Sequence, residues 1–240
     1  MNTDSLKRLW KTVFGDPDSF IDCFFRTAFS PNRCKCIEET GEAICALYWF
    51  DCEYEGGELA YIYAVATHPE HRGKGLASHL MEETHAHLKD LGYAGAVLKP
   101  AKGLFPFYER LGYTTSGYIR RFSAKAGPVP CDVTPLSAED YGRLRRAYLP
   151  ENGIRQEGLT LDFLHTFAEF YASDDAILCV NREDPVIFEY LGNPDSAPGI
   201  LAVFGIADAE IPTIGQEIPY AMHCPLNCTK IPGYLGITLE

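Results

Sequence analysis

The stretch that decides the fold is YAVATHPEHRGKGLA, residues 63–77. It continues a charge-free apolar run that begins at Leu59, and such a run is typical of a strand covered on both faces. After the turn, leucines recur at helical spacing from Gly75 to Leu91, and Gly92 ends the pattern, which predicts an amphipathic helix. The stretch therefore joins a buried strand to a long helix through a turn that contains two glycines and two cations.

The turn itself is predicted to bind an anion. The first N–H groups of a helix have no partners within the helix and lie at the positive end of its dipole. Gly73 and Gly75 allow the main chain to come close to a ligand, while Arg72 and Lys74 add fixed positive charge. Pyrophosphate is the ligand that fits this combination.

The segments around this stretch predict a mixed α/β (α+β) fold of packed layers. In chain order, the pattern indicates two helices, three strands, a helix, a strand, a short helix and a strand. These elements are residues 5–14, 19–29, 34–38, 43–54, 59–67, 75–91, 94–98, 104–111 and part of 113–123. A central sheet flanked by helices accounts for this order.

A Gly/Pro-rich break at residues 126–130 is interpreted as a linker between two domains, residues 1–126 and 131–240. The second part opens with a short strand that runs into Ser137, which is expected to cap the next helix together with Asp140. Two helices are predicted at residues 138–149 and 160–172, followed by strands at residues 176–180, 186–191, 218–224 and 234–239. Because this order resembles that of the first part, we expect two copies of one architecture.

The charge balance differs between the two parts. Residues 1–130 carry 15 Lys and Arg against 16 Asp and Glu, whereas residues 131–240 carry 6 against 17, a net charge of −11. A surface this acidic repels a phosphate backbone, so the expected partner is a cationic small molecule or peptide and not nucleic acid. Solubility alone is the alternative explanation of the acidity.

The composition is that of an ordinary globular protein, with 46% hydrophobic and 22% charged residues. The longest charge-free apolar stretches, residues 43–50 and 59–67, have about half the length of a membrane helix, so no membrane association is expected. The N-terminal residues lack the basic start and apolar run of a secretory signal. We therefore expect a cytoplasmic protein whose nine cysteines are reduced thiols, and no metal site, because convincing ligand spacings are missing.

A second motif, PFYERLGY at residues 106–113, follows the long helix and the next strand. Together the two motifs resemble the GNAT acyl-CoA N-acyltransferase superfamily, whose pyrophosphate loop reads Arg/Gln-x-x-Gly-x-Gly/Ala. The chain is most similar to the Eis-like branch with tandem GNAT domains, where Tyr-x-Arg-Phe-Gly-Tyr matches Tyr108 to Tyr113 except at Leu111. The strand before the loop, the helix after it and the second motif make the resemblance specific over residues 5–123.

The resemblance implies a GNAT fold with acetyl-CoA as the co-substrate and no metal. Main-chain groups of Val65, Ala66 and Thr67 would bind the pantetheine arm. The residues that would cradle the pyrophosphate are Arg72, Gly73, Lys74, Gly75, Leu76, Ala77 and Ser78. Tyr108 matches the family's general acid, which protonates the departing CoA thiolate; an ordinary core tyrosine is the alternative.

Acetyl transfer to an amine also needs a site for the oxyanion and a base. Main-chain N–H groups near Val65 or Ala66 would stabilise the tetrahedral oxyanion. An alkylamine has a pKa of about 10 and must lose a proton before it attacks, which calls for a carboxylate. Glu58 is a candidate because some GNAT enzymes hold their base near this position. Further candidates are Asp51, Glu53 and Glu55 of the preceding hairpin. The resemblance adds the C-terminal carboxylate of Glu240, because the Eis-like branch can bring its chain terminus into the active site.

The expected function is transfer of an acetyl group from acetyl-CoA to a primary amine, by direct attack in a ternary complex. A non-catalytic acyl-CoA-binding or regulatory module is the alternative. The acceptor site would have the acidic second part as one wall, or would be an apolar pocket lined by Tyr48, Trp49, Phe50 and Phe105. The sequence predicts no oligomeric state.

Two features depart from the family pattern. The first strand of a standard GNAT domain should precede the first helix, where only residues 1–4 stand, so that strand is missing or supplied from elsewhere. Between Leu191 and Gly215 there is no equivalent of the glycine loop, so the second part is expected to be a degenerate GNAT-like domain that buttresses the first.

Overall fold

The computed structural model describes residues 2–181, 183 and 186–239. By its contacts the chain divides into two compact units. Unit 1 is residues 1–114 with 222–231, and unit 2 is residues 115–221 with 232–240. The chain thus leaves unit 1 and returns to it near the C-terminus.

Unit 1 contains the elements predicted from its sequence, with small shifts at their ends. They are α1 (Thr3–Phe14), α2 (Asp18–Thr27), β1 (Cys34–Glu39), β2 (Glu42–Tyr54), β3 (Gly57–Thr67), α3 (Leu76–Asp90), β4 (Gly95–Leu98) and α4 (Phe105–Glu109). The expected mixed α/β fold is confirmed.

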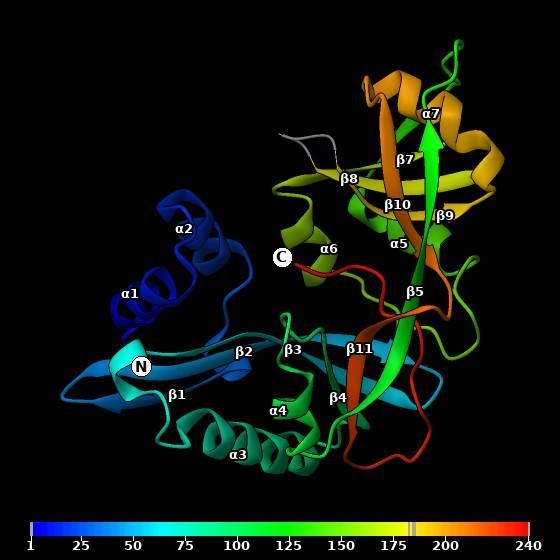
Figure 1. Cartoon of the computed structure of the whole chain (residues 1–240). Coiled ribbons are helices and arrows are strands. Elements are labelled where there is room, and N and C mark those ends of the chain that lie inside the picture. The colour runs from blue at the N-terminus through cyan, green and yellow to red at the C-terminus, as the bar shows by residue number, and fades with distance from the viewer. Residues whose placement is uncertain (1, 182, 184–185, 240) are drawn as a thin grey trace. The chain divides into compact units, whose positions relative to one another are not determined.

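The sheet of unit 1 is covered on both faces, with α1 and α2 on one side and α3 and α4 on the other (Figure 1). On the first side, the Trp10 ring of α1 lies 5.5 Å from the Tyr48 ring and 5.7 Å from the Tyr63 ring. On the second side, Trp49 and Ile62 share a buried core with residues of α3 and α4. Successive side chains of a strand point to opposite faces, which explains why β2 and β3 are apolar at nearly every position.

A distant segment completes this sheet. Met222–Pro225 of β11 (Ile218–Pro225) pairs antiparallel with β4. Within unit 1 the sheet has the order β1-β2-β3-β4-β11. Within unit 2, β5 (Thr114–Lys125) pairs antiparallel with β10 (Asp208–Ile214). Gly95 has to be a glycine, because a Cβ there would overlap the buried imidazole of His223 on β11.

Unit 2 has a second sheet of order β6-β7-β8-β9. Its strands are β6 (Thr134–Leu136), β7 (Ala168–Ala172), β8 (Ala176–Asn181) and β9 (Ile187–Gly192), and its helices are α5 (Ala138–Arg145), α6 (Leu159–Leu164) and α7 (Ala197–Phe204). Ser137 caps α5 as predicted, since its Oγ accepts from the N–H of Asp140 at 3.0 Å. The domain limits 1–126 and 131–240 stay a prediction. The two compact units group residues by their contacts, which does not show where one copy of a fold ends and the next begins.

Three predictions for unit 2 need correction. The helix predicted at residues 160–172 ends at Leu164, and Ala168–Ala172 form β7, because pairing with both β6 and β8 outweighs local helical preference. Residues 234–239 are buried but are not a strand. The sequence pattern also failed to indicate α7 and β10.

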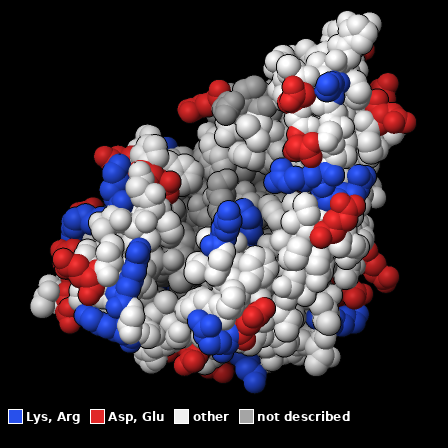
Figure 2. Space-filling view, in the orientation of Figure 1, with Lys and Arg blue, Asp and Glu red and all other residues white. Residues whose placement is uncertain are grey.

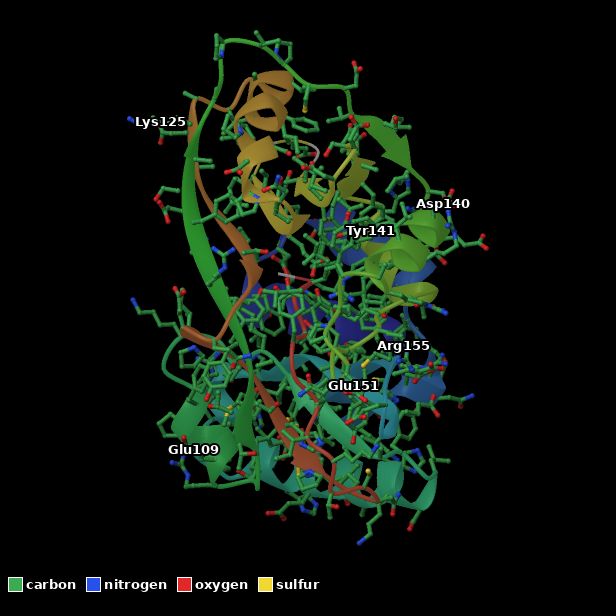
Figure 3. The ribbon with its side chains drawn as sticks, turned by 90° about the vertical axis from the view of Figure 1, so that its right-hand side faces the viewer. Glu109, Lys125, Asp140, Tyr141, Glu151 and Arg155 are labelled. Carbon is green, nitrogen blue, oxygen red and sulfur yellow. The ribbon has the colours of Figure 1, made fainter. Side chains whose placement is uncertain are left out.

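The buried C-terminal segment is fastened by side chains instead of a strand ladder. Arg145 lies fully buried against Glu189 at 2.8 Å, and its guanidinium also donates to the carbonyls of Ile154 and Leu235, both at 2.9 Å. Tyr141 donates to Glu189 at 2.6 Å. In Figure 3, Tyr141 points into the unit while the neighbouring Asp140 points outward. The sequence pattern could not foresee this network, whose members come from α5, β9 and the last residues.

Candidate active site

The end of β3 carries a β-bulge. Ala46 of β2 faces Ala66 of β3, and Tyr48 faces Tyr63. Leu47, the single residue between Ala46 and Tyr48, therefore lies opposite two residues of β3, Ala64 and Val65. Ala64 has a φ of 49°, a left-handed conformation that is uncommon for residues other than glycine. A bulge leaves the extra residue outside the ladder and twists the strand. Main-chain groups next to Val65 are therefore released from pairing with β2.

Beside the bulge, β3 also parts from β4. Their parallel pairing covers Leu59–Tyr61 against Gly95–Val97. β4 ends at Leu98, whereas β3 continues to Thr67. The predicted pantetheine residues, Val65, Ala66 and Thr67, therefore lie on a section of β3 beyond its pairing with β4.

The glycine turn has the backbone conformation that its sequence suggests. Gly73 and Gly75 both have a φ of 76°, and a Cβ at either position would meet open space. Glycine is therefore favoured at both positions because the backbone is left-handed, not because a side chain would lack space. All four turn residues, Arg72 to Gly75, are exposed.

The start of α3 is open for an anion. Gly75 is the N-cap and gives no side-chain cap, and the first turn of the helix holds no acidic residue. The first hydrogen bond of the helix runs from the N–H of His79 to the carbonyl of Gly75, at 3.0 Å. The N–H groups of Leu76, Ala77 and Ser78 therefore have no partner within the helix.

The two cations of the turn differ in their contacts. The Arg72 Nε donates to the carbonyl of Thr67 at 3.2 Å, so this side chain fastens the turn to the end of β3. Its terminal nitrogens extend from an exposed position, as does Lys74. Thr67 in turn lies against Cys45, with 3.3 Å between Oγ1 and Sγ. Arg72 thus has a structural role that the sequence did not indicate.

Tyr108 lies in α4, where its side chain is 7% exposed. It belongs to the core that α3 and α4 form with the sheet. Its ring contacts the Phe107 ring at 5.0 Å and the Tyr113 ring at 5.7 Å. A residue that is mostly buried but keeps some exposure is compatible with either a core tyrosine or a proton donor.

Glu58 lies at the opposite end of β3 from the turn. It is exposed and faces Glu53 across the β2–β3 hairpin. Burial raises the pKa of Glu58, and Asp51 and Glu53 raise it further. At about 3.3 Å per residue, Glu58 lies about 23 Å along the strand from Val65.

Asp51, another candidate base, is already engaged. It forms an ion pair with Arg33 and accepts a hydrogen bond of 2.6 Å from the Tyr93 hydroxyl. Burial and this hydrogen bond raise the pKa of Tyr93. Glu55 pairs with Lys230 at 3.3 Å, and Glu240 lies outside the described residues. The sequence could not reveal these pairings, since Arg33 and Lys230 come from distant parts of the chain.

The apolar acceptor pocket proposed from the sequence is wrong. Tyr48 and Phe50 pack with Phe24 of α2 on one face of the sheet. Trp49 and Phe105 pack in the core on the other face. Because neighbouring residues of a strand point to opposite faces, these four side chains cannot line one pocket.

The bulged strand, the glycine turn and the uncapped helix start belong to one α/β domain, in which β3 extends beyond its pairing with β4. Residues 2–116 match the family model for the acetyltransferase (GNAT) domain, and this part of the chain belongs to that family. No curated protein sequence matches the chain at a significant level.

Solved structures with the same fold cover most of the chain. A GCN5-related N-acetyltransferase from Anabaena variabilis is similar with a TM-score of 0.70 at 14% identity, over 94% of this chain and 71% of that one. A putative acetyltransferase from Pyrococcus horikoshii has a TM-score of 0.66 at 12% identity, over 98% and 90%. Eis1 from Mycobacterium abscessus has a TM-score of 0.64 at 12% identity, over 93% and 71%. These structures show the same fold, and the predicted resemblance to the GNAT family is confirmed by the family model over residues 2–116.

The described residues contain no group of three His, Cys, Asp or Glu placed to hold a metal ion. Within the same part of the chain, no helix is both long and apolar enough to cross a membrane. All nine cysteines are free thiols.

Proposed function

We propose that the protein is an acetyl-CoA-dependent N-acetyltransferase that acetylates a primary amine of a cationic small molecule or peptide. The observation that carries this proposal is the junction of β3 and α3, with its exposed cations, two left-handed glycines and uncapped helix start. Such a junction favours pyrophosphate, because N–H groups, helix dipole and side-chain charge all act on the same point.

The co-substrate would lie along unit 1. Its pyrophosphate would accept from the N–H groups of Leu76 to Ser78, with Arg72 and Lys74 beside it. Its pantetheine arm would follow β3 at Val65 to Thr67, where that strand runs past the end of β4. This placement puts the thioester next to the bulge at Ala64.

The reaction proceeds by direct attack within a ternary complex. The amine, once deprotonated, forms a bond to the thioester carbonyl carbon, and the resulting oxyanion is stabilised by main-chain N–H groups at the bulge. Collapse of this intermediate breaks the carbon–sulfur bond. Before the attack, a carboxylate takes the proton that the ammonium loses. Tyr108 donates a proton to the CoA thiolate, and the proton that the attacking nitrogen loses on collapse returns Tyr108 to its neutral form.

Glu58 stays the proposed base. Its raised pKa makes it a better proton acceptor than an ordinary glutamate. Its distance along β3 from the bulge requires that the proton reach it through water. A Glu58→Gln variant should therefore lower turnover at neutral pH and leave acetyl-CoA affinity unchanged.

The cationic acceptor is inferred from charge. Residues 131–240 have a net charge of −11. On the face seen in Figure 2, basic and acidic groups are interspersed among larger uncharged areas. Attraction of the acceptor would therefore come from the net charge and not from a continuous acidic patch on this face.

The decisive experiment is a thiol-release assay with acetyl-CoA and a panel of polyamines, aminoglycoside-like amines and lysine-containing peptides. Acceptor-dependent release is expected, and Tyr108→Phe should lower kcat about a hundredfold with little change in acetyl-CoA affinity. Tyr148→Phe, the same change on a half-exposed tyrosine of unit 2, should have no effect. Acetyl-CoA binding without release on any amine would instead identify a non-catalytic acyl-CoA-binding module.

A further inference from the structure

The end of α4 fixes the position of the Tyr108 ring. Gly112 has a φ of 85°, its N–H donates to the Glu109 carbonyl, and the N–H of Tyr113 donates to the Tyr108 carbonyl, both at 3.1 Å. These two bonds form a Schellman motif, which often brings the side chains of its first and last residues into contact. Here those side chains are Tyr108 and Tyr113, whose ring planes meet at 71°. The Tyr113 ring therefore forms one wall of the space that Tyr108 occupies.

The Tyr113 ring is itself fixed through its hydroxyl. Tyr113 is 1% exposed, and a buried tyrosine hydroxyl needs a hydrogen-bond partner. That partner is the Nε2 of His85 on α3, at 2.8 Å. Burial lowers the pKa of His85 to about 4, so the imidazole is neutral at physiological pH. A neutral imidazole can hold this hydroxyl without bringing a charge into the core.

We propose that His85 and Tyr113 are positioning residues that hold Tyr108 in place for proton donation. This inference rests on the proposed function. His85 fixes the Tyr113 hydroxyl, and the Tyr113 ring then limits the positions open to the Tyr108 ring. A proton donor must stay within hydrogen-bond reach of the sulfur, and a displacement of about 1 Å can cost about a hundredfold in rate.

The placement of His85 adds a second consequence. His85 and the proposed pyrophosphate donors, Leu76 to Ser78, belong to the same helix. One rigid element therefore holds both the anion end of acetyl-CoA and, through Tyr113, the group that protonates its sulfur end. The distance between the two functions is fixed by the fold before the co-substrate binds.

The test compares two substitutions of His85 in the full chain. His85→Leu removes the partner of the Tyr113 hydroxyl, whereas His85→Gln keeps a hydrogen-bonding group. We expect His85→Leu to lower kcat about tenfold while the KM for acetyl-CoA stays within about twofold. His85→Gln should recover most of kcat. His87→Leu, the same change at a half-buried histidine of the same helix, is the matched control and should be active.

A second variant covers the case in which His85→Leu does not fold. Tyr113→Phe keeps the ring and loses only the hydroxyl, so it should fold and show the same fall in kcat without a change in KM. Full kcat in either folded variant would overturn this inference while Tyr108→Phe still reports on the general acid. If the wild-type protein releases no thiol with any amine, the proposed function fails instead, which is a distinct result.

Discussion

Both units contain two helices, three strands, a helix and a strand in that order, and they differ at the junction between the third strand and the following helix. In unit 1, β3 is followed by the 3-10 turn Pro69–His71 and then by Arg72 to Gly75 before α3 begins. In unit 2, β9 is followed by the 3-10 turn Pro194–Ser196, and α7 begins directly at Ala197. The second junction thus lacks the segment that carries the glycines and cations.

The second junction is also occupied by acidic groups of its own. Asp195 lies in the first turn of the 3-10 helix, and the Ser196 hydroxyl donates to Asp175 at 2.6 Å. Carboxylates at a helix start oppose the binding of another anion. The comparison indicates that the proposed anion site depends on the short segment from Arg72 to Gly75 and not on the layered fold itself.

The units also use their charged residues differently. Unit 1 leaves Arg72 and Lys74 at the surface, whereas unit 2 buries Arg145 against Glu189. Exposed cations can bind a ligand, whereas a buried ion pair can only affect the stability of the fold. This contrast predicts which substitutions change binding and which change stability.

The largest expected effect is on the stability of unit 2. Glu189→Ala leaves the Arg145 guanidinium buried without its carboxylate, which should lower the free energy of unfolding by about 3–5 kcal/mol. Chemical denaturation measures this change. Asp22→Ala, which breaks the exposed pair with Lys7, is the control and should cost less than about 1 kcal/mol. Equal effects of the two variants would contradict the contrast between buried and exposed charge.

The next effect is on binding by unit 1. The double variant Arg72→Glu/Lys74→Glu should weaken CoA binding about a hundredfold or more, which corresponds to about 2.7 kcal/mol, and should leave the fold intact. Isothermal titration calorimetry measures the affinity, with Arg26→Glu on the exposed side of α2 as the control for a charge reversal away from the turn. Asp195→Lys places a cation at the unit 2 junction and should create no second CoA site. Unchanged affinity in the double variant would remove the pyrophosphate assignment.

Much of unit 1 was predictable from local sequence. The apolar run from Leu59 and the leucine spacing after Gly75 predict β3 and α3, because each pattern reflects burial of a single element. The glycine turn was predictable for the same reason, since two glycines at a helix start indicate left-handed backbone.

The remainder depends on contacts between distant residues. Nothing in the sequence near Ala64 indicates the bulge, which comes from the register between β2 and β3. The insertion of β11 beside β4 joins segments more than a hundred residues apart, and β7 became a strand because two neighbours pair with it. The His85 hydrogen bond to Tyr113 likewise needs the packed structure of α3 against α4.

A smaller effect separates conformational strain from binding. Gly75→Ala and Gly205→Ala each place a Cβ in open space at a left-handed position, with φ of 76° and 67°. Each should cost about 1 kcal/mol in stability, measured by thermal unfolding. Only Gly75→Ala should also weaken CoA binding, by a few fold, because it moves the helix start. A loss of affinity in Gly205→Ala would mean that strain anywhere in the chain affects the site.

The smallest effect concerns the acceptor. Arg33 pairs with Asp51 and Lys230 pairs with Glu55, so the β2–β3 hairpin attracts a cationic acceptor less than its sequence suggests. The net charge of −11 on residues 131–240 therefore has to supply most of the attraction. Such attraction is screened over about 8 Å at physiological ionic strength. The KM of a polyamine acceptor should therefore rise a few fold with added salt, while the KM for acetyl-CoA rises less or falls. A monoamine with the same reacting group is the matched control. If both acceptors respond to salt equally, the acidity of the second part serves solubility alone.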